Sequence, residues 1–533
     1  MTPTITITGQ TAEVQFRAFD LDAYRLFLKA KALPEKQVAY DRDTDTYRFT
    51  THKRFAGMLG TLISERSVEE LPVSPFLFDY QQFIVTRAME AQRFAVFADT
   101  GLGKTLMELE IARQVLHRVS GKVLLMTMPK IIPQTIEEAK QFYPEMPVLH
   151  LTTREALIAW LVNGEDGVAI SNYEKMIPGL IPEFRYLSAL LLDEASVLKT
   201  GGGKIKWNLI KSAKGLPYKF TFTATPAPND TQEYASQASF LEKIQGFWDF
   251  FLKKGEGKGD WYLKPHAAQA FYRFMASWSI FMRQPARFGF ADNLASIPAP
   301  VFHDIEIPAT QEQMDFAMGV FATAGSGLFG DKALGVVHRT KLSEAAKGFV
   351  YDHSAPHGVR HISSQKPSSV AGLVRDCIRE GRQVLVWTVF DEESALIEQA
   401  LRNCFVYRGE TVPDHAFAVL KGGMKETAQI ETLERFRHGE VRALISKPQL
   451  LGFGMNFQFC TAMIFSGWDD SYERYYQAVR RAYRYGQTEE VHIYMPVVSE
   501  LEGPILENLM RKRANFEADA QAQEDAFIEV YRT

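Results

Sequence analysis

Two series of short apolar segments, each alternating with amphipathic segments, constrain the fold of this chain more than any other feature. The first series lies at Phe94–Phe97, Val123–Met128, Gly167–Ile170, Ala189–Leu192 and Lys219–Phe222, and the second at Gln383–Trp387, Ala416–Leu420, Arg442–Ile445, Ala462–Phe465 and Val491–Met495. Short apolar strands that alternate with helices are typical of parallel sheets. The sequence therefore predicts an α/β protein with two tandem parallel-sheet lobes.

The rest of the chain divides where composition and pattern change. Residues 1–72 combine strand-like alternation with a helical stretch around Leu21–Leu33, which predicts a small α+β accessory domain. We predict the first lobe at 73–235 and the second at 369–500. An aromatic and basic helical insertion is expected at 236–300, a linker with the entry to the second lobe at 301–368, and a C-terminal helix at 501–533.

Composition narrows the class of protein. The 533 residues are 46% hydrophobic and 23% charged, which excludes disorder and fibrous proteins, and the net charge of -4 gives no overall positive field. Three cysteines are too few for a disulfide framework, so a reducing compartment is expected. The N-terminus does not resemble a signal peptide, and the apolar run Phe316–Gly330 is shorter than the ~20 residues of a membrane span. We expect a cytoplasmic protein with no membrane contact.

A glycine-rich loop follows the first strand of the first lobe. Phe94–Phe97 leads into the sequence ADTGLGKT at 98–105, and a helical pattern follows at Leu106–Val115. Backbone N–H groups and a helix N-terminus in such a turn bind phosphates. We therefore predict that ATP is held by Thr100, Gly101, Leu102, Gly103, Lys104 and Thr105, with Lys104 at the β- and γ-phosphates and Thr105 at Mg²⁺. The strict GxxxxGK[ST] pattern has a small residue, Ala98, at its first position.

A pair of carboxylates ends another strand of the same lobe. The apolar run Ala189–Leu192 leads into Asp193 and Glu194, 89 residues after Lys104. A carboxylate at the tip of a strand beside a phosphate loop is placed to hold Mg²⁺, and its neighbour can polarise the attacking water. We predict that Asp193 binds Mg²⁺ and that Glu194 activates water. Without the upstream loop, the same pair would indicate only a solvated turn.

Several further strings resemble the motifs of one family. Residues 193–196 are similar to motif II of the superfamily 2 helicases, residues 223–226 (TATP) to motif III, and residues 77–81 (LFDYQ) to the Gln motif. The branch that they resemble is the Snf2-like DNA translocases. Within it, residues 225–230 (TPAPND) and 277–283 (SWSIFMR) resemble the small phage or prophage-encoded members. The resemblance implies that Gln81 reads adenine and that Ser196, Thr223 and Thr225 couple the nucleotide state to the grip on nucleic acid. Ser196 stands where the family often has His.

The second lobe extends this resemblance. Val384–Trp387 is similar to motif IV, Ser446 and Lys447 together with Gly452–Phe457 to motif V, and Gln477–Gln487 to motif VI, QAxxRxxRxGQ, at every defined position. The resemblance implies two RecA-like lobes, with Arg481 and Arg484 approaching the γ-phosphate across the cleft between them. It also implies a nucleotide-binding role for Gly454 and Asn456 and a coupling role for Gln477. The spacing of three between Arg481 and Arg484 predicts that these two arginines share one helical face.

Candidate nucleic-acid contacts come from the family motifs and from the insertion. By resemblance to motifs Ia, Ib and V, they are Pro129, Lys130, Ser171, Asn172, Tyr173 and Ser446. Residues 245–290 carry seven Lys or Arg, three Asp or Glu and three Trp. Their aromatic residues recur at roughly helical spacing, which predicts a packed core, while Lys253, Lys254 and Lys258 in a glycine-rich loop are predicted to contact DNA.

The sequence thus indicates a monomeric ATP-dependent DNA translocase or helicase with ATP and Mg²⁺ as cofactors. It is expected in a bacterial or phage-infected cell, at the nucleoid, binding DNA through one groove in a salt-sensitive way. Two alternatives stay open: an enzyme of the same superfamily that moves along RNA, and a non-catalytic nucleic-acid-binding module. Six histidines in or near loops match no metal-ligand spacing: His266, His303, His338, His353, His357 and His361.

Overall fold

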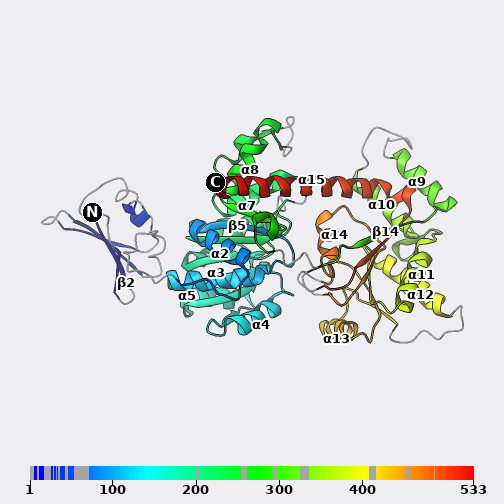
Figure 1. Cartoon of the computed structure of the whole chain (residues 1–533), viewed down its shortest axis with the longest axis horizontal. Helices are drawn as coiled ribbons and strands as arrows, with labels where there is room; N and C mark the ends of the chain where they lie inside the picture. Colours follow the sequence, from blue (N-terminus) through cyan, green and yellow to red (C-terminus); the bar gives the residue numbers. More distant parts are fainter. Residues whose placement is uncertain are drawn as a thin grey trace. The chain divides into compact units, whose positions relative to one another are not determined.

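The computed structural model describes residues 5–8, 11–16, 26–27, 29–31, 33, 36–41, 46–52, 71–199, 203–227, 229–253, 261–291, 297–323, 335–406, 416–451, 457–484 and 487–532. The chain forms two compact units (Figure 1). The first unit comprises Met1–Ala291 and Asp519–Thr533, and the second comprises Asp292–Ala518. Each unit is described by itself below.

The first unit is built on a parallel sheet that has seven strands within the described residues, in the order β13-β5-β10-β9-β6-β8-β7. The strands are β5 (Arg93–Ala98), β6 (Lys122–Thr127), β7 (Val148–His150), β8 (Gly167–Asn172), β9 (Leu187–Leu192), β10 (Tyr218–Thr223) and β13 (Ser279–Met282). Every residue of β6, β9 and β10 is buried, as in strands covered on both faces. The predicted parallel sheet is confirmed.

Helices connect these strands (Figure 1). They are α2 (Asp79–Ala91), α3 (Lys104–Arg118), α4 (Ile132–Phe142), α5 (Arg154–Asn163), α6 (Lys204–Ser212), α7 (Tyr234–Phe240) and α8 (Ala268–Ala276). Short 3-10 turns lie at η2 (Tyr173–Met176), η3 (Pro182–Tyr186), η4 (Ala195–Lys199), η5 (Thr231–Glu233), η6 (Phe247–Phe250), η7 (Pro265–Ala267) and η8 (Pro285–Phe288). Helix α3 begins directly after the glycine-rich loop, as the sequence predicts.

The second unit contains another parallel sheet, with six strands in its described part, in the order β14-β21-β20-β17-β19-β18. These are β14 (Val301–Glu306), β17 (Val384–Trp387), β18 (Phe417–Val419), β19 (Ala443–Ser446), β20 (Ala462–Phe465) and β21 (His492–Val497). Its helices are α9 (Gln311–Thr323), α10 (Val336–Ala346), α11 (Lys366–Arg379), α12 (Asp391–Val406), α13 (Glu426–Arg437) and α14 (Tyr472–Val479), and α15 (Ser499–Arg532) belongs to this unit up to Ala518. A small antiparallel pair, β15 (Phe349–Tyr351) and β16 (Val359–His361), flanks the 3-10 turn η9 (Pro356–Gly358).

The N-terminal segment forms an antiparallel sheet in the order β1-β2-β4-β3. The strands are β1 (Ile5–Thr8), β2 (Thr11–Phe16), β3 (Gln37–Asp41) and β4 (Thr46–His52). A small core that includes Val14, Phe16, Leu26 and Phe49 joins the sheet to the helical residues 26–31 that are described. The predicted α+β module is confirmed. The sequence did not indicate β3, because all five of its residues are exposed and no apolar alternation marks it.

The insertion combines a packed core with strands that the sequence did not predict. Phe247, Phe251, Phe271 and Trp278 are buried, which confirms the predicted aromatic core. The segment also contains a hairpin of β11 (Phe251–Lys253) and β12 (Trp261–Leu263). It further contributes β13, which pairs in parallel with β5 at the edge of the main sheet. The insertion is therefore partly built into the first sheet rather than wholly helical.

The end of α15 packs on this insertion within the first unit. Three arginines of the insertion pair with its acidic residues: Arg273 with Glu529, Arg283 with Glu524, and Arg287 with Glu524 and Asp525. The Glu524 side chain is fully buried. Three of the seven basic residues at 245–290 are thus paired with acidic residues of α15. Within the described residues, no helix combines the length and the apolar character that crossing a membrane requires.

Candidate nucleotide-binding site

The glycine-rich loop between β5 and α3 has a backbone that requires glycine. Gly101 has φ +89° and Gly103 has φ +69°, in the left-handed region that L-residues rarely adopt. A Cβ on Gly103 would lie 2.3 Å from the side-chain nitrogen of Gln81. The loop therefore wraps tightly at the N-terminus of α3, where unpaired backbone N–H groups and the helix dipole favour an anion.

Gln81 supports this loop from α2. Its side chain is buried; the Oε1 atom accepts a hydrogen bond from the backbone N–H of Phe78 (2.9 Å), and Nε2 donates to the carbonyl oxygen of Leu102 (2.9 Å). The hydroxyl of Tyr80 also donates to the Leu102 carbonyl, at 3.3 Å. Gln81 thus joins the start of α2 to the loop. Adenine reading by Gln81 stays a prediction.

Lys104 begins α3 and turns back toward the loop. Its Nζ donates hydrogen bonds to the carbonyl oxygens of Ala98 (3.1 Å) and Asp99 (3.3 Å). The carboxylate of Asp99 accepts from the backbone N–H of Thr100 at 2.6 Å. Thr105, the second residue of α3, is half-buried. An ammonium group is therefore held against the loop backbone, as a phosphate-binding loop requires.

The two predicted carboxylates follow β9 and are both nearly buried, at 8% exposure. The Asp193 side chain accepts hydrogen bonds from the Thr127 hydroxyl (2.7 Å) and from the backbone N–H of Glu194 (2.8 Å). The Tyr173 hydroxyl donates to the Asp193 carbonyl oxygen. Glu194 has φ +46°, an uncommon backbone conformation for a residue with a side chain. The sheet edge thus fixes both the backbone and the side chain of Asp193.

A third carboxyl group, Glu108, belongs to this cluster and was not predicted. It lies on α3 one turn after Lys104 and is fully buried. Burial raises its pKa well above the ordinary value, and the negative charge of Asp193 raises it further, while Lys104 lowers it. A Glu inside an amphipathic helix ordinarily indicates a solvated face. The signal that could have found it is its spacing of four from Lys104, which puts both on one helical face.

The donor set fits a nucleotide bound with Mg²⁺. Mg²⁺ prefers oxygen ligands and is commonly held by one or two carboxylates together with phosphate oxygens. Asp193 offers such a carboxylate. Thr127 positions it, and it lies close to Glu108, which also faces Lys104. Among the described residues, no three His, Cys, Asp or Glu side chains form a metal cage without phosphates.

The predicted coupling residues of the first unit, Ser196, Thr223 and Thr225, are buried. Ser196 lies in η4, where its hydroxyl donates to the Glu194 carbonyl oxygen at 3.5 Å. The Thr223 hydroxyl accepts from the backbone N–H of Thr225 at 3.2 Å. Sequence reasoning missed Gln237 of α7, whose side-chain amide donates to the Ala195 carbonyl oxygen at 3.0 Å. This bond connects the segment after Asp193 and Glu194 to the helix that follows Thr225.

The predicted nucleic-acid contacts of the first unit differ in their exposure to solvent. Pro129 and Lys130 are exposed at the end of β6. Asn172 is half-buried and caps η2 through a hydrogen bond from the Glu174 N–H. Ser171 and Tyr173 are buried, and their hydroxyls donate to backbone carbonyl oxygens within the unit, so their contact with nucleic acid stays a prediction. Lys253 is exposed on the hairpin, whereas Lys254 and Lys258 lie outside the described residues.

In the second unit, the predicted helical face for Arg481 and Arg484 is wrong. Helix α14 ends at Val479, and both arginines lie in the turns that follow. The reason is tertiary: the Phe457 N–H donates to the Arg481 carbonyl oxygen at 3.0 Å, and Gln487 donates to the Gln458 carbonyl oxygen at 2.8 Å. These bonds hold the motif VI segment against the motif V segment in place of a continued helix.

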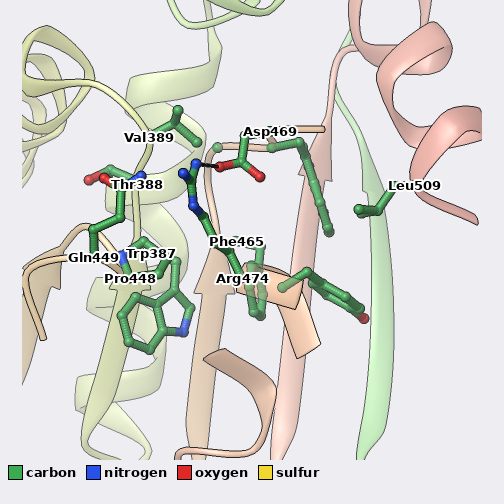
Figure 2. A pocket seen from close by; sticks show the side chains of 12 residues that line it. Trp387, Thr388, Val389, Pro448, Gln449, Phe465, Asp469, Arg474 and Leu509 are labelled. Carbon is green, nitrogen blue, oxygen red and sulfur yellow. Dashed lines mark hydrogen bonds and ion pairs between the residues drawn. The ribbon is translucent and has the colours of Figure 1, made fainter. Parts of the chain in front are cut away.

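Of the remaining predicted residues of the second unit, two lie in the described part of the chain. Ser446 is buried at the end of β19, and Gln477 is buried on α14, where its Nε2 has no hydrogen-bond partner among the described residues. Gly454 and Asn456 lie outside the described residues. A pocket lies at this sheet edge (Figure 2). It is lined by Trp387, Thr388, Val389, Pro448, Gln449, Phe465, Gly467, Trp468, Asp469, Arg474, Tyr475 and Leu509, and Arg474 pairs there with Asp469 at 2.5 Å.

Two family models match the chain in the order of its two sheets. Residues 75–228 match the family described as type III restriction enzyme, res subunit, and residues 365–486 match the helicase conserved C-terminal domain. The helicase SWR1 of Cryptococcus neoformans is 32% identical over 144 residues, 26% of this chain. In these matches the chain is similar to the superfamily 2 helicases and to their Snf2-like branch. This Snf2-like chain spans a tenth or less of the length of the fungal SWR1 relatives that it matches.

A longer similarity is to a phage protein. The putative protein p41 of Acyrthosiphon pisum secondary endosymbiont phage 1 is 23% identical over 437 residues, which cover 75% of this Snf2-like chain and 87% of p41. Among solved structures, the SWI2/SNF2 ATPase core domain of Sulfolobus solfataricus is 18% identical with a TM-score of 0.37, covering 86% of this chain and 95% of that one.

Proposed function

We propose that this protein is an ATP-dependent DNA translocase that couples ATP hydrolysis to movement along DNA, or to its remodelling or unwinding. The observation that carries the proposal is the Asp193 carboxylate, fixed by Thr127 beside the buried Glu108 that also faces Lys104. A phosphate-binding loop and a Mg²⁺-binding carboxylate are the two parts that phosphoryl transfer to water requires from this unit. Similarity to the Snf2-like helicases supports DNA as the track.

The residues divide the chemistry among them. Mg²⁺, when bound with ATP, neutralises charge on the β- and γ-phosphates. Lys104 binds the same phosphates, and Asp193 orients the metal ion. The Glu194 carboxylate accepts a proton from the attacking water, while the guanidinium groups of Arg481 and Arg484 stabilise the charge on the transferring phosphoryl group. Lys104, Asp193 and Glu194 are already held in place by the backbone bonds and burial described above.

On the DNA side, we propose contacts by exposed residues of the first unit. Lys130 at the end of β6 and Lys253 on the hairpin are exposed cations that can neutralise phosphates. Asn172, half-buried at the start of η2, offers a polar side chain as a further contact. The enzyme would act as a monomer, with ATP and Mg²⁺ as its cofactors.

The choice of nucleic acid is tested by the activator of ATP hydrolysis. Phosphate release by the full chain is measured with duplex DNA, single-stranded DNA and RNA at equal nucleotide concentration. We expect DNA to stimulate hydrolysis and RNA to have little effect. Stimulation by RNA above that by either DNA would overturn the assignment of the track, and hydrolysis that no nucleic acid changes would overturn the translocase proposal itself.

A further inference from the structure

One stretch of the first unit is strongly basic although the chain as a whole is slightly acidic. Residues 195–229 contain six lysines and no Asp or Glu, within a chain that has 60 basic and 64 acidic residues. This stretch begins directly after Asp193 and Glu194 and includes α6. A local excess of positive charge of this kind favours an anionic partner.

Some lysines of this stretch are buried within the unit, and others lie at its surface. Lys219 is fully buried and pairs with Glu242 at 2.9 Å. Lys206 is nearly buried, with its Nζ over the Trp207 ring at 5.1 Å. Of the nine residues of α6, the exposed ones are Lys204, Trp207 and Lys211. Their spacing of three and four places them on one face of the helix, which we call the α6 stripe.

Other residues of α6, beside and opposite this stripe, fix the helix to the segment that carries Asn172. Leu209 is buried, the Asn208 side chain donates to the Met176 carbonyl oxygen at 2.7 Å, and the Ser212 hydroxyl accepts from the Ile181 N–H at 2.9 Å. Met176 ends η2, the turn that Asn172 caps. The α6 stripe is therefore held on the same part of the unit as a residue already proposed to contact DNA.

We propose that the α6 stripe binds the phosphate backbone of duplex DNA, with Lys204 and Lys211 at phosphates and Trp207 packed against the sugars between them. This inference rests on the proposed function and adds a DNA contact to it. Seven residues at a rise of 1.5 Å place the two lysine Cα atoms about 10 Å apart along the helix, so that the two ammonium groups reach separate phosphates. An exposed aromatic ring between two cations suits a nucleic-acid backbone better than bulk solvent.

The salt dependence of DNA binding tests the two lysines. Binding of the full chain to a labelled duplex is measured by fluorescence anisotropy over a range of NaCl concentrations. Each phosphate contact contributes about 0.9 to the slope of log K against log salt, so Lys204→Ala and Lys211→Ala should each lower the slope by about 0.9, and the double variant by about 1.8. The control is Lys140→Ala on α4, an exposed lysine whose removal changes the net charge equally and should leave the slope unchanged.

The tryptophan is tested by a matched pair of variants. Trp207→Ala should weaken duplex binding by about tenfold, while Trp207→Phe keeps a ring and should retain most of the affinity. Unchanged slopes for both lysine variants, or an equal fall for Lys140→Ala, would overturn the α6 stripe. If the wild-type protein binds DNA and is stimulated by it while the stripe variants keep the wild-type slope, this inference fails alone. If the wild-type protein does not bind DNA, the proposed function fails with it.

Discussion

The Thr127 hydroxyl donates a hydrogen bond of 2.7 Å to the Asp193 carboxylate and so joins the ends of two neighbouring parallel strands, β6 and β9. Thr127 is buried, yet Pro129 and Lys130, two and three residues further on, are exposed. One short segment thus supports the proposed Mg²⁺ ligand at one end and presents a cation to solvent at the other. It offers a short route between nucleotide and DNA.

Removing the hydrogen bond between Thr127 and Asp193 should raise the Mg²⁺ concentration that ATP hydrolysis requires. Thr127→Val keeps the shape of the side chain but leaves Asp193 without one charge-assisted hydrogen bond, which costs about 1.5–3 kcal/mol. We expect the Mg²⁺ concentration for half-maximal ATP hydrolysis to rise several-fold. Thr127→Ser retains the hydroxyl and should resemble the wild type. An unaltered Mg²⁺ dependence in the Val variant would show that Thr127 does not position the metal ligand.

The contact between Gly103 and Gln81 predicts coupled mutational effects. Gly103→Ala places a side chain at φ +69° and its Cβ 2.3 Å from the Gln81 amide, so it should lower both stability and the affinity for a fluorescent ATP analogue. Gln81→Ala removes the clash but not the strained φ, so the double variant should recover part of the loss caused by Gly103→Ala. Thermal unfolding and nucleotide titration measure this double-mutant cycle. Strict additivity of the two changes would contradict the contact.

Glu524 should anchor the end of α15 to the insertion. Its buried carboxylate accepts from the Arg283 N–H at 2.8 Å and pairs with both Arg283 and Arg287. Glu524→Gln leaves the partly buried Arg283 guanidinium uncompensated and leaves Arg287 with Asp525 as its acidic partner, at a cost of about 2 kcal/mol, and should make the C-terminal helix more sensitive to limited proteolysis. The control on the same helix is Glu529→Gln, whose exposed pair with Arg273 should contribute little. Equal effects of the two variants would contradict this anchor.

Asp519 gives the stability of the first unit a pH dependence. Burial raises the pKa of its carboxyl to about 6, although the Tyr272 hydroxyl donates to it and lowers the pKa in part. Because the folded-state pKa lies above the unfolded value, the contribution of Asp519 to stability is greatest below pH 4 and is lost as pH rises toward 6. Asp519→Asn should therefore stabilise the protein at pH 7.5 by roughly 1 kcal/mol more than at pH 5. Urea unfolding at the two pH values measures the difference, and a constant difference would contradict the raised pKa.

The sheets were predictable because their strands are short, fully apolar runs separated by helical patterns. Strand β13 escaped prediction since its partner β5 lies far away in the sequence, and a buried four-residue run has no periodicity that separates strand from helix. The end of α14 escaped prediction for a similar reason. The bond between Phe457 and Arg481 is a tertiary contact that helical spacing does not report.

Residues of the nucleotide site were predictable where both the residue type and its place after a loop or a strand are typical of such a site. Lys104 follows a glycine loop and Asp193 follows a strand, so the sequence alone assigns both. Glu108 was not, because the sequence does not show that its face of α3 is buried against Asp193. The net charge of the insertion was also misleading, since its arginines pair with α15.

ATP hydrolysis by the full chain with and without duplex DNA tests the central claim most directly. The wild type is compared with Lys104→Ala, Glu194→Gln and Arg481→Ala, and thermal unfolding establishes that each variant is folded. We predict that DNA stimulates hydrolysis by the wild type and that each of the three variants loses this stimulated hydrolysis while keeping the wild-type unfolding midpoint. Wild-type turnover in any of the three folded variants would contradict it.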